Sequence, residues 1–220
     1  MKKIIFLLLT VCLCLPAAVM ADNTDKKAAK RAEKERKERV KENRKESKKV
    51  LKQLEKEGWK VLGSTRTLET MLMRHYEKLD LGGDDAREVV GIATSVKSKN
   101  TGKQMASTNA AISYVQEYSE MRGRMLTDVT ANGAMSEAEF EHFYSAFERE
   151  VQKDIKGELT ESFSIIRENG DGNYEVQSFF ILNESSATKA RLRSLDNALK
   201  ESEAAQRQAE RISAFVRGEK

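Results

Sequence analysis

The stretch that decides the fold is residues 159–182, LTESFSIIRENGDGNYEVQSFFIL. Two runs rich in β-branched and aromatic residues, Leu159–Arg167 and Tyr174–Leu182, flank the sequence Asn169-Gly170-Asp171-Gly172-Asn173. A cluster of turn formers between two such runs predicts a β-hairpin with its tip at the asparagines and glycines. The turn could also suggest a calcium loop, but the twelfth residue counted from Asn169 is Phe180 where such a loop needs a glutamate.

The second strand of this hairpin is apolar on both sides at its end. Alternation places Val176, Ser178, Phe180 and Leu182 on one face and Phe179 and Ile181 on the other. We therefore expect both faces to be covered, either by helices or by a second copy of the protein.

Before the hairpin, Ser136-x-x-Glu139 has the pattern of a capping box and predicts the start of a helix that Gly157 closes. Its stripe is the clearest amphipathic pattern in the chain: Phe140, Phe143, Tyr144, Phe147, Val151 and Ile155. A stripe of this kind usually packs in a core. The alternative is a small-ligand pocket between this helix and the sheet, lined by residues such as Phe143, Phe147 and Phe163.

The remaining periodicities complete the order of elements. Helices are expected over 68–79, over about 103–126 and from Ser186 to about Arg217, and a strand over 88–96. Residues 59–62 form a short strand or a docking loop. Few strands, partly adjacent, indicate an α+β fold: a small antiparallel sheet with a C-terminal hairpin packed against helices, preceded by a charged N-terminal helix and followed by a long C-terminal helix. The predicted segments are 1–21, 22–57, 58–184 and 185–220.

Residues 1–21 have the three parts of a cleavable secretory signal peptide. Lys2 and Lys3 precede an apolar run from Ile4 to Leu15, and Val19 and Ala21 are small residues suited to cleavage after Ala21. The expected location is therefore periplasmic or secreted, with no transmembrane anchor after cleavage. Both cysteines and the only proline lie in this segment, so the mature chain needs no disulfide to fold.

Two alternatives to cleavage remain open. Cys12 and Cys14 could belong to a lipoprotein signal, although Val11 and Leu13, which precede them, are not small. The second alternative is that residues 1–21 stay attached as an uncleaved membrane anchor. The basic charge that follows the apolar run opposes translocation of the chain across the membrane and so favours this alternative.

Charge divides the mature chain into two parts. Residues 26–57 carry 15 Lys and Arg against 7 Glu, a net charge of +8, whereas residues 58–220 carry 22 basic and 26 acidic residues, a net charge of −4. We call residues 22–57 the basic arm. Strong helix formers and (i, i+4) pairs such as Glu33–Lys37 predict a solvated helix that joins the rest of the protein only through Val50, Leu51 and Leu54.

The basic arm is either a spacer or a surface that adheres to anionic lipid head groups, lipopolysaccharide or cell-wall polymer. Without interleaved aromatic residues it does not indicate nucleic-acid binding. The residues expected to contact an anionic surface are Lys30, Arg31, Lys34, Arg36, Lys37, Lys41, Arg44, Lys45, Lys48 and Lys49.

No catalytic, cofactor or metal motif is found. The mature chain has no cysteine, which excludes thiol nucleophiles and thiolate metal sites. Glu139-x-x-His142 matches half of a di-iron motif, but Leu72 stands where a matching glutamate would precede His75. We expect both histidines to lie on helices, at the surface or its boundary, and we expect no cofactor.

Several segments resemble a group of uncharacterised secreted proteins of Gram-negative gut bacteria. They are Glu57-Gly58-Trp59-Lys60-Val61 after a Lys-rich helix, Leu68-Glu69, the strand Val90–Ser95 and the stretch Ser162–Leu182 before an Ala-rich helix. The group is similar to the small surface-lipoprotein domain shared with the N-terminal part of the flagellar assembly protein FlgT. The resemblance covers about residues 50–200 and implies an α+β envelope protein with no assigned catalytic residues.

The expectation is therefore a non-enzymatic exported envelope protein, a protein- or surface-interaction module, with a homo-oligomer among the expected forms. Its partners would be envelope proteins or an anionic envelope surface, not nucleic acid. The alternative is a periplasmic small-ligand binding protein.

Overall fold

The computed structural model describes residues 17–131 and 133–219. Within the first helix, the side chains of residues 17–26, 28–29, 32, 35–36, 39, 43–44 and 46 are not described. Residues 1–16 of the predicted signal peptide lie outside the described residues, so its cleavage stays a prediction. No helix among the described residues has the length and apolar character needed to cross a bilayer.

The predicted hairpin is confirmed as β3 (Thr160–Glu168) and β4 (Tyr174–Asn183). At its tip the amide of Asn169 donates to the carbonyl of Asn173 over 2.7 Å, and Gly172 adopts a positive φ of 73° that favours glycine. Two further strands, β1 (Lys60–Val61) and β2 (Ala86–Val96), complete an antiparallel sheet in the order β1-β3-β4-β2. The fold is therefore α+β, as predicted.

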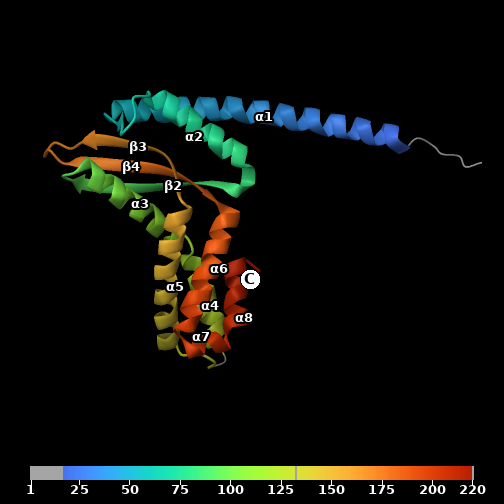
Figure 1. Cartoon of the computed structure of the whole chain (residues 1–220), viewed down its shortest axis with the longest axis vertical. Helices are drawn as coiled ribbons and strands as arrows, with labels where there is room; N and C mark the ends of the chain where they lie inside the picture. The colour runs from blue at the N-terminus through green and yellow to red at the C-terminus, as the bar shows by residue number, and fades with distance from the viewer. Residues whose placement is uncertain (1–16, 132, 220) are drawn as a thin grey trace, which may run out of the picture. The chain divides into compact units, whose positions relative to one another are not determined.

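One face of the sheet is covered by α3 (Lys99–Gln116), as Figure 1 shows. Ala93, Val96, Ile166 and Val176 pack there with Ala106 of that helix. Small residues allow the close approach, because a β-carbon on Gly102 would lie 2.7 Å from a methyl of Val176. Beneath them Ser164 and Ser178, directly opposite in the register, hydrogen-bond to each other over 2.8 Å.

The other face is covered by α2 (Leu68–Gly82) and by the last turns of α1 (Ala17–Lys56). Phe163 and Ile165 of β3 pack there with Leu54, Trp59 and Leu72. The predicted contact of the arm through Val50, Leu51 and Leu54 is confirmed. Both faces of the hairpin are thus covered by the protein's own helices, so the apolar faces no longer argue for a second copy.

The remaining helices form the largest apolar cluster, beyond one end of the sheet (Figure 1). They are α4 (Ser119–Thr130), α5 (Glu137–Glu158), α6 (Glu184–Lys200), α7 (Glu203–Arg207) and α8 (Ala209–Arg217), with a short 3-10 turn, Gly83–Asp85, after α2. Helix α5 begins at the predicted capping box: the Ser136 hydroxyl accepts from the Glu139 amide, and the Glu139 carboxylate accepts from the Ser136 amide.

Two predicted helices are interrupted in the structure. The helix expected over 103–126 ends at Gln116 and restarts at Ser119, because Tyr118 leaves helical geometry and its hydroxyl bonds to that of Tyr114. The C-terminal segment breaks at Ser202, whose hydroxyl caps α7, and this lets α8 pack against α6 in one core. Tertiary packing decides both breaks, since the residues involved are compatible with helix.

The chain divides into two units, one ending at Glu42 and the other running from Asn43 to Lys220. We call Asn43–Lys220 the main unit. It contains the sheet, helices α2 to α8 and the last turns of α1, including Leu54.

Candidate functional site

All of the basic arm except its last residue, Glu57, lies within α1, because strong helix formers without a breaker run from Lys26 to Lys56. Eight of the ten residues predicted to contact an anionic surface have described side chains, and all eight are exposed: Lys30, Arg31, Lys34, Lys37, Lys41, Lys45, Lys48 and Lys49. The side chains of Arg36 and Arg44 lie outside the described residues. The predicted pair Glu33–Lys37 is confirmed at 2.6 Å between Oε1 and Nζ.

This helix presents many cations to solvent and little apolar surface. Between Lys26 and Lys49 the only large apolar residue is Val40. A contact made by such a helix is electrostatic, since it offers no apolar face that could insert between lipid chains.

The predicted pocket residues are not brought together. Phe143 and Phe147 of α5 lie in the large helical cluster, where Phe143 is 0% exposed. Phe163, 3% exposed, belongs to the cluster on the opposite face of the sheet and stacks on Phe179 with 4.4 Å between ring centroids. The β-bulge between Glu161 and Phe163 precedes this residue in the register. The three side chains therefore line no common cavity, and the location given for a small-ligand pocket is wrong.

His75 is not at the surface, contrary to expectation, but is 1% exposed. Its ring packs edge-on against Tyr76, Phe163 and Phe179, with centroids 5.6 to 5.9 Å apart. Its Nε2 contacts the carboxylate of Glu88 on β2, and no described group hydrogen-bonds its Nδ1. The aromatic side chains enclose the His75 ring, and its contact with Glu88 links α2 to the sheet.

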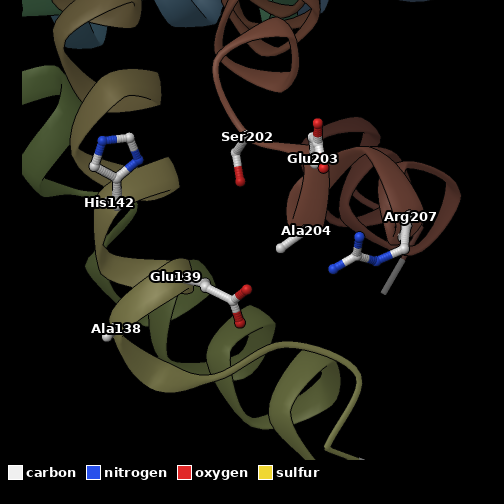
Figure 2. Close-up of a pocket in the computed structure, with 7 residues that line it drawn as sticks. All are labelled: Ala138, Glu139, His142, Ser202, Glu203, Ala204 and Arg207. Carbon is white, nitrogen blue, oxygen red and sulfur yellow. The ribbon is translucent and has the colours of Figure 1, made fainter.

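His142 is exposed, as expected, and lines an open groove of about 410 Å³ between α5 and α7 (Figure 2). The groove is also lined by Ala138, Glu139, Ser202, Glu203, Ala204 and Arg207. Figure 2 shows the Glu139 carboxylate and the Arg207 guanidinium extending into the groove from opposite sides.

Two of the polar groups that line this groove, Glu139 and Ser202, cap helices. The pKa of the Glu139 carboxyl lies below its ordinary value because the Ser136 amide donates to it, the Ser136 hydroxyl does likewise, and Arg207 adds its charge. Ser202 caps α7.

A buried polar cluster links three helices and was not predicted. Arg191 of α6 donates to the hydroxyls of Tyr114 and Tyr118, the latter over 2.7 Å, and Glu184 lies 3.6 Å away. Burial raises the pKa of the Tyr114 hydroxyl above its ordinary value. The cluster explains how the end of α3 is fixed to α6.

A second unpredicted feature is a cavity of about 280 Å³ at the hairpin end of the sheet. Lys60, Lys99 and Arg167 line it together with Tyr174. These cations are distant in the sequence, so no local pattern could have grouped them. The sequence did indicate the short strand at Lys60 and the two hairpin strands. It did not indicate the register in which these strands pair.

Among the described residues, no three His, Asp or Glu side chains are placed to hold a metal ion. The comparisons with known proteins add no assignment: no protein-family model, no curated protein and no solved structure matches this chain.

Proposed function

We propose that this chain is a non-enzymatic exported envelope protein, an interaction module whose basic arm adheres to an anionic envelope surface. The observation that carries the proposal is the row of exposed cations along α1, eight of which have described side chains. The arm has a net charge of +8 over residues 26–57, opposite in sign to the −4 of residues 58–220.

The physical argument is long-range attraction. Each basic residue close to an anionic membrane contributes about 1 kcal/mol of attraction at moderate salt, and the effect decays within a Debye length. Because Val40 is the only large apolar residue between Lys26 and Lys49, the binding should be reversible and salt-sensitive.

The test is co-sedimentation of the mature chain with vesicles of phosphatidylcholine alone or with about 30% phosphatidylglycerol, in about 0.05 M and about 0.5 M salt. Removal of residues 22–57 is a poor variant, because it takes away Leu54, which packs with Trp59 and Leu68. We therefore choose the variant K30Q/K34Q/K37Q/K41Q, which keeps strong helix formers at exposed positions.

The matched control removes the same charge from the main unit, at the exposed lysines Lys78, Lys153, Lys189 and Lys200. The proposal expects binding to anionic vesicles that disappears in high salt, falls strongly in the arm variant and is kept in the control. Equal loss in both variants, or binding that persists in high salt, would show that the arm is a spacer.

A further inference from the structure

The cavity at the hairpin end of the sheet is formed by chain ends that the topology brings together. Lys60 of β1 pairs with Ile166 of β3, and both Glu168 and Val96 pair with Tyr174 at the start of β4. Helix α3 begins three residues after Val96, at Lys99. The cavity of about 280 Å³ is lined by Gly58, Lys60, Lys99, Ile166, Arg167, Glu168 and Tyr174.

Its three cations are not equivalent. Arg167 is held in place: it donates to Glu175 over 2.8 Å, lies 3.6 Å from Glu57, and its guanidinium stands 4.6 Å from the Trp59 ring centroid. Its charge is therefore compensated. Among the described residues, by contrast, neither Lys60 nor Lys99 forms an ion pair with a carboxylate.

One of these lysines, Lys99, is nevertheless oriented. The Lys99 ammonium lies 5.1 Å from the centroid of the Tyr174 ring, a cation–π contact that restrains it without neutralising it. Gly58 borders the cavity with a φ of +80°, and a β-carbon there would meet nothing within 4 Å, so the backbone side of the cavity is open. Two uncompensated ammonium groups around an open cavity favour an anion.

The fourth charged group at the cavity, Glu168, bears on which anion can bind there. The Glu168 carboxylate also lines the cavity and has no cation paired with it among the described residues. A carboxylate repels an anion that is fully ionised, but it accepts a hydrogen bond from an anion that keeps a proton. A phosphate group keeps one proton below its second pKa of about 6, whereas sulfate has none.

We propose that this cavity binds a phosphate group, with Lys60 and Lys99 donating to its oxygens and Glu168 accepting from its hydroxyl. The proposal goes beyond the adhesion of the arm, because every lining residue belongs to the main unit. The phosphate can belong to a soluble sugar phosphate or to a phosphomonoester lipid headgroup.

The experiment is a titration of the ¹⁵N-labelled mature chain with inorganic phosphate near pH 6, followed by amide chemical shifts. Ionic strength is held constant with chloride. The expected result is saturable shifts at Lys60, Lys99 and Glu168, and binding weakened at least about tenfold in K60Q/K99Q, since two charge-assisted contacts are lost. The matched control K189Q/K200Q, at exposed positions of α6, should bind as the parent does.

Two further variants separate this proposal from others. The arm variant K30Q/K34Q/K37Q/K41Q should leave the phosphate shifts unchanged, so failure of the arm proposal and failure of this one are distinguishable. The variant E168Q should abolish the preference for phosphate over sulfate, because it removes the repulsion of the ion that has no proton. Shifts that chloride reproduces, or an equal loss in K189Q/K200Q, would overturn the proposal.

The source of the phosphate is read from two ligands in the same assay. Tighter binding of glucose 6-phosphate supports a soluble or polysaccharide source, and tighter binding of short-chain phosphatidic acid supports a lipid headgroup. Failure of both ligands, as well as inorganic phosphate, to shift the cavity amides would overturn the proposal.

Discussion

Gly91 of β2 lies directly under Ala106 of α3. A β-carbon on Gly91 would approach the Ala106 carbonyl oxygen more closely than van der Waals contact allows and would lie 2.8 Å from the amide nitrogen of Ala110. The obstructing atoms are backbone, so they cannot rotate away as a side chain could. This contact sets how closely α3 covers the sheet.

Gly91→Ala should therefore destabilise the protein by about 3 kcal/mol or more, because α3 has to move away from the sheet. Urea unfolding followed by circular dichroism measures the loss. Gly123→Ala is the matched control: Gly123 lies within α4 with nothing within 4 Å of the added carbon. That change should stabilise the protein by about 0.5 to 1 kcal/mol. A free energy of unfolding for Gly91→Ala equal to that of the parent would contradict the close packing of α3 on β2.

Ser136→Ala should cost about 1 kcal/mol in the free energy of unfolding. The substitution removes the hydroxyl that accepts from the Glu139 amide over 3.2 Å and leaves that amide without its cap. Ser136→Asp keeps an acceptor at the same position and should lose much less. Equal losses in both variants, measured by thermal unfolding, would show that the hydroxyl does not act as the cap.

Stability on the acid side should depend on Glu139. Its pKa is lowered in the folded protein, first by the bond from the Ser136 amide, so the folded state binds fewer protons there than the unfolded state does. The contribution is present above the unfolded pKa of about 4.3 and is lost as the pH falls through the folded value. The urea midpoint should therefore fall less between pH 6 and pH 3 in Glu139→Gln than in the parent.

The control for this pH dependence is Glu137→Gln, which removes a carboxylate from the same helical turn without touching the capping box. Its acid sensitivity should match that of the parent. If Glu139→Gln loses as much stability on acidification as the parent does, the capping carboxylate makes no net contribution to the free energy of unfolding.

Replacement of His75 should distinguish its ring from its nitrogens. His75→Ala leaves a void among Tyr76, Phe163 and Phe179 and should cost about 3 kcal/mol. His75→Phe keeps a ring and removes the buried Nδ1 that has no partner, and Glu88, 39% exposed, can be hydrated instead. The phenylalanine variant should thus lose about 1 kcal/mol or less.

His142→Ala serves as the control at the second histidine, which is exposed, and should change stability by no more than about 0.5 kcal/mol. Chemical unfolding of the three variants under one buffer condition is sufficient. If His75→Phe costs as much as His75→Ala, then the contact with Glu88, and not the aromatic packing, holds α2 on the sheet.

Local signals were enough for most of the secondary structure. The turn Asn169–Asn173, the capping box at Ser136 and the stripe from Phe140 to Ile155 act over three to five residues, and each appears in the structure where it was predicted. The same holds for the helical state of the basic arm, which rests on residue propensities and on pairs one turn apart.

Tertiary structure decided which residues meet. Phe163 faces away from Phe143 because alternation along β3 and the bulge beside it set its side of the sheet, and the bulge does not show in the spacing. His75 is buried because α2 lies on that face, and the breaks at Tyr118 and Ser202 arise where helices turn to reach a shared core. Lys60 and Arg167 line one cavity through strand register, and Lys99 joins them because α3 begins just after β2. A single sequence encodes short-range geometry directly, whereas such meetings depend on the packing of segments far apart along the chain.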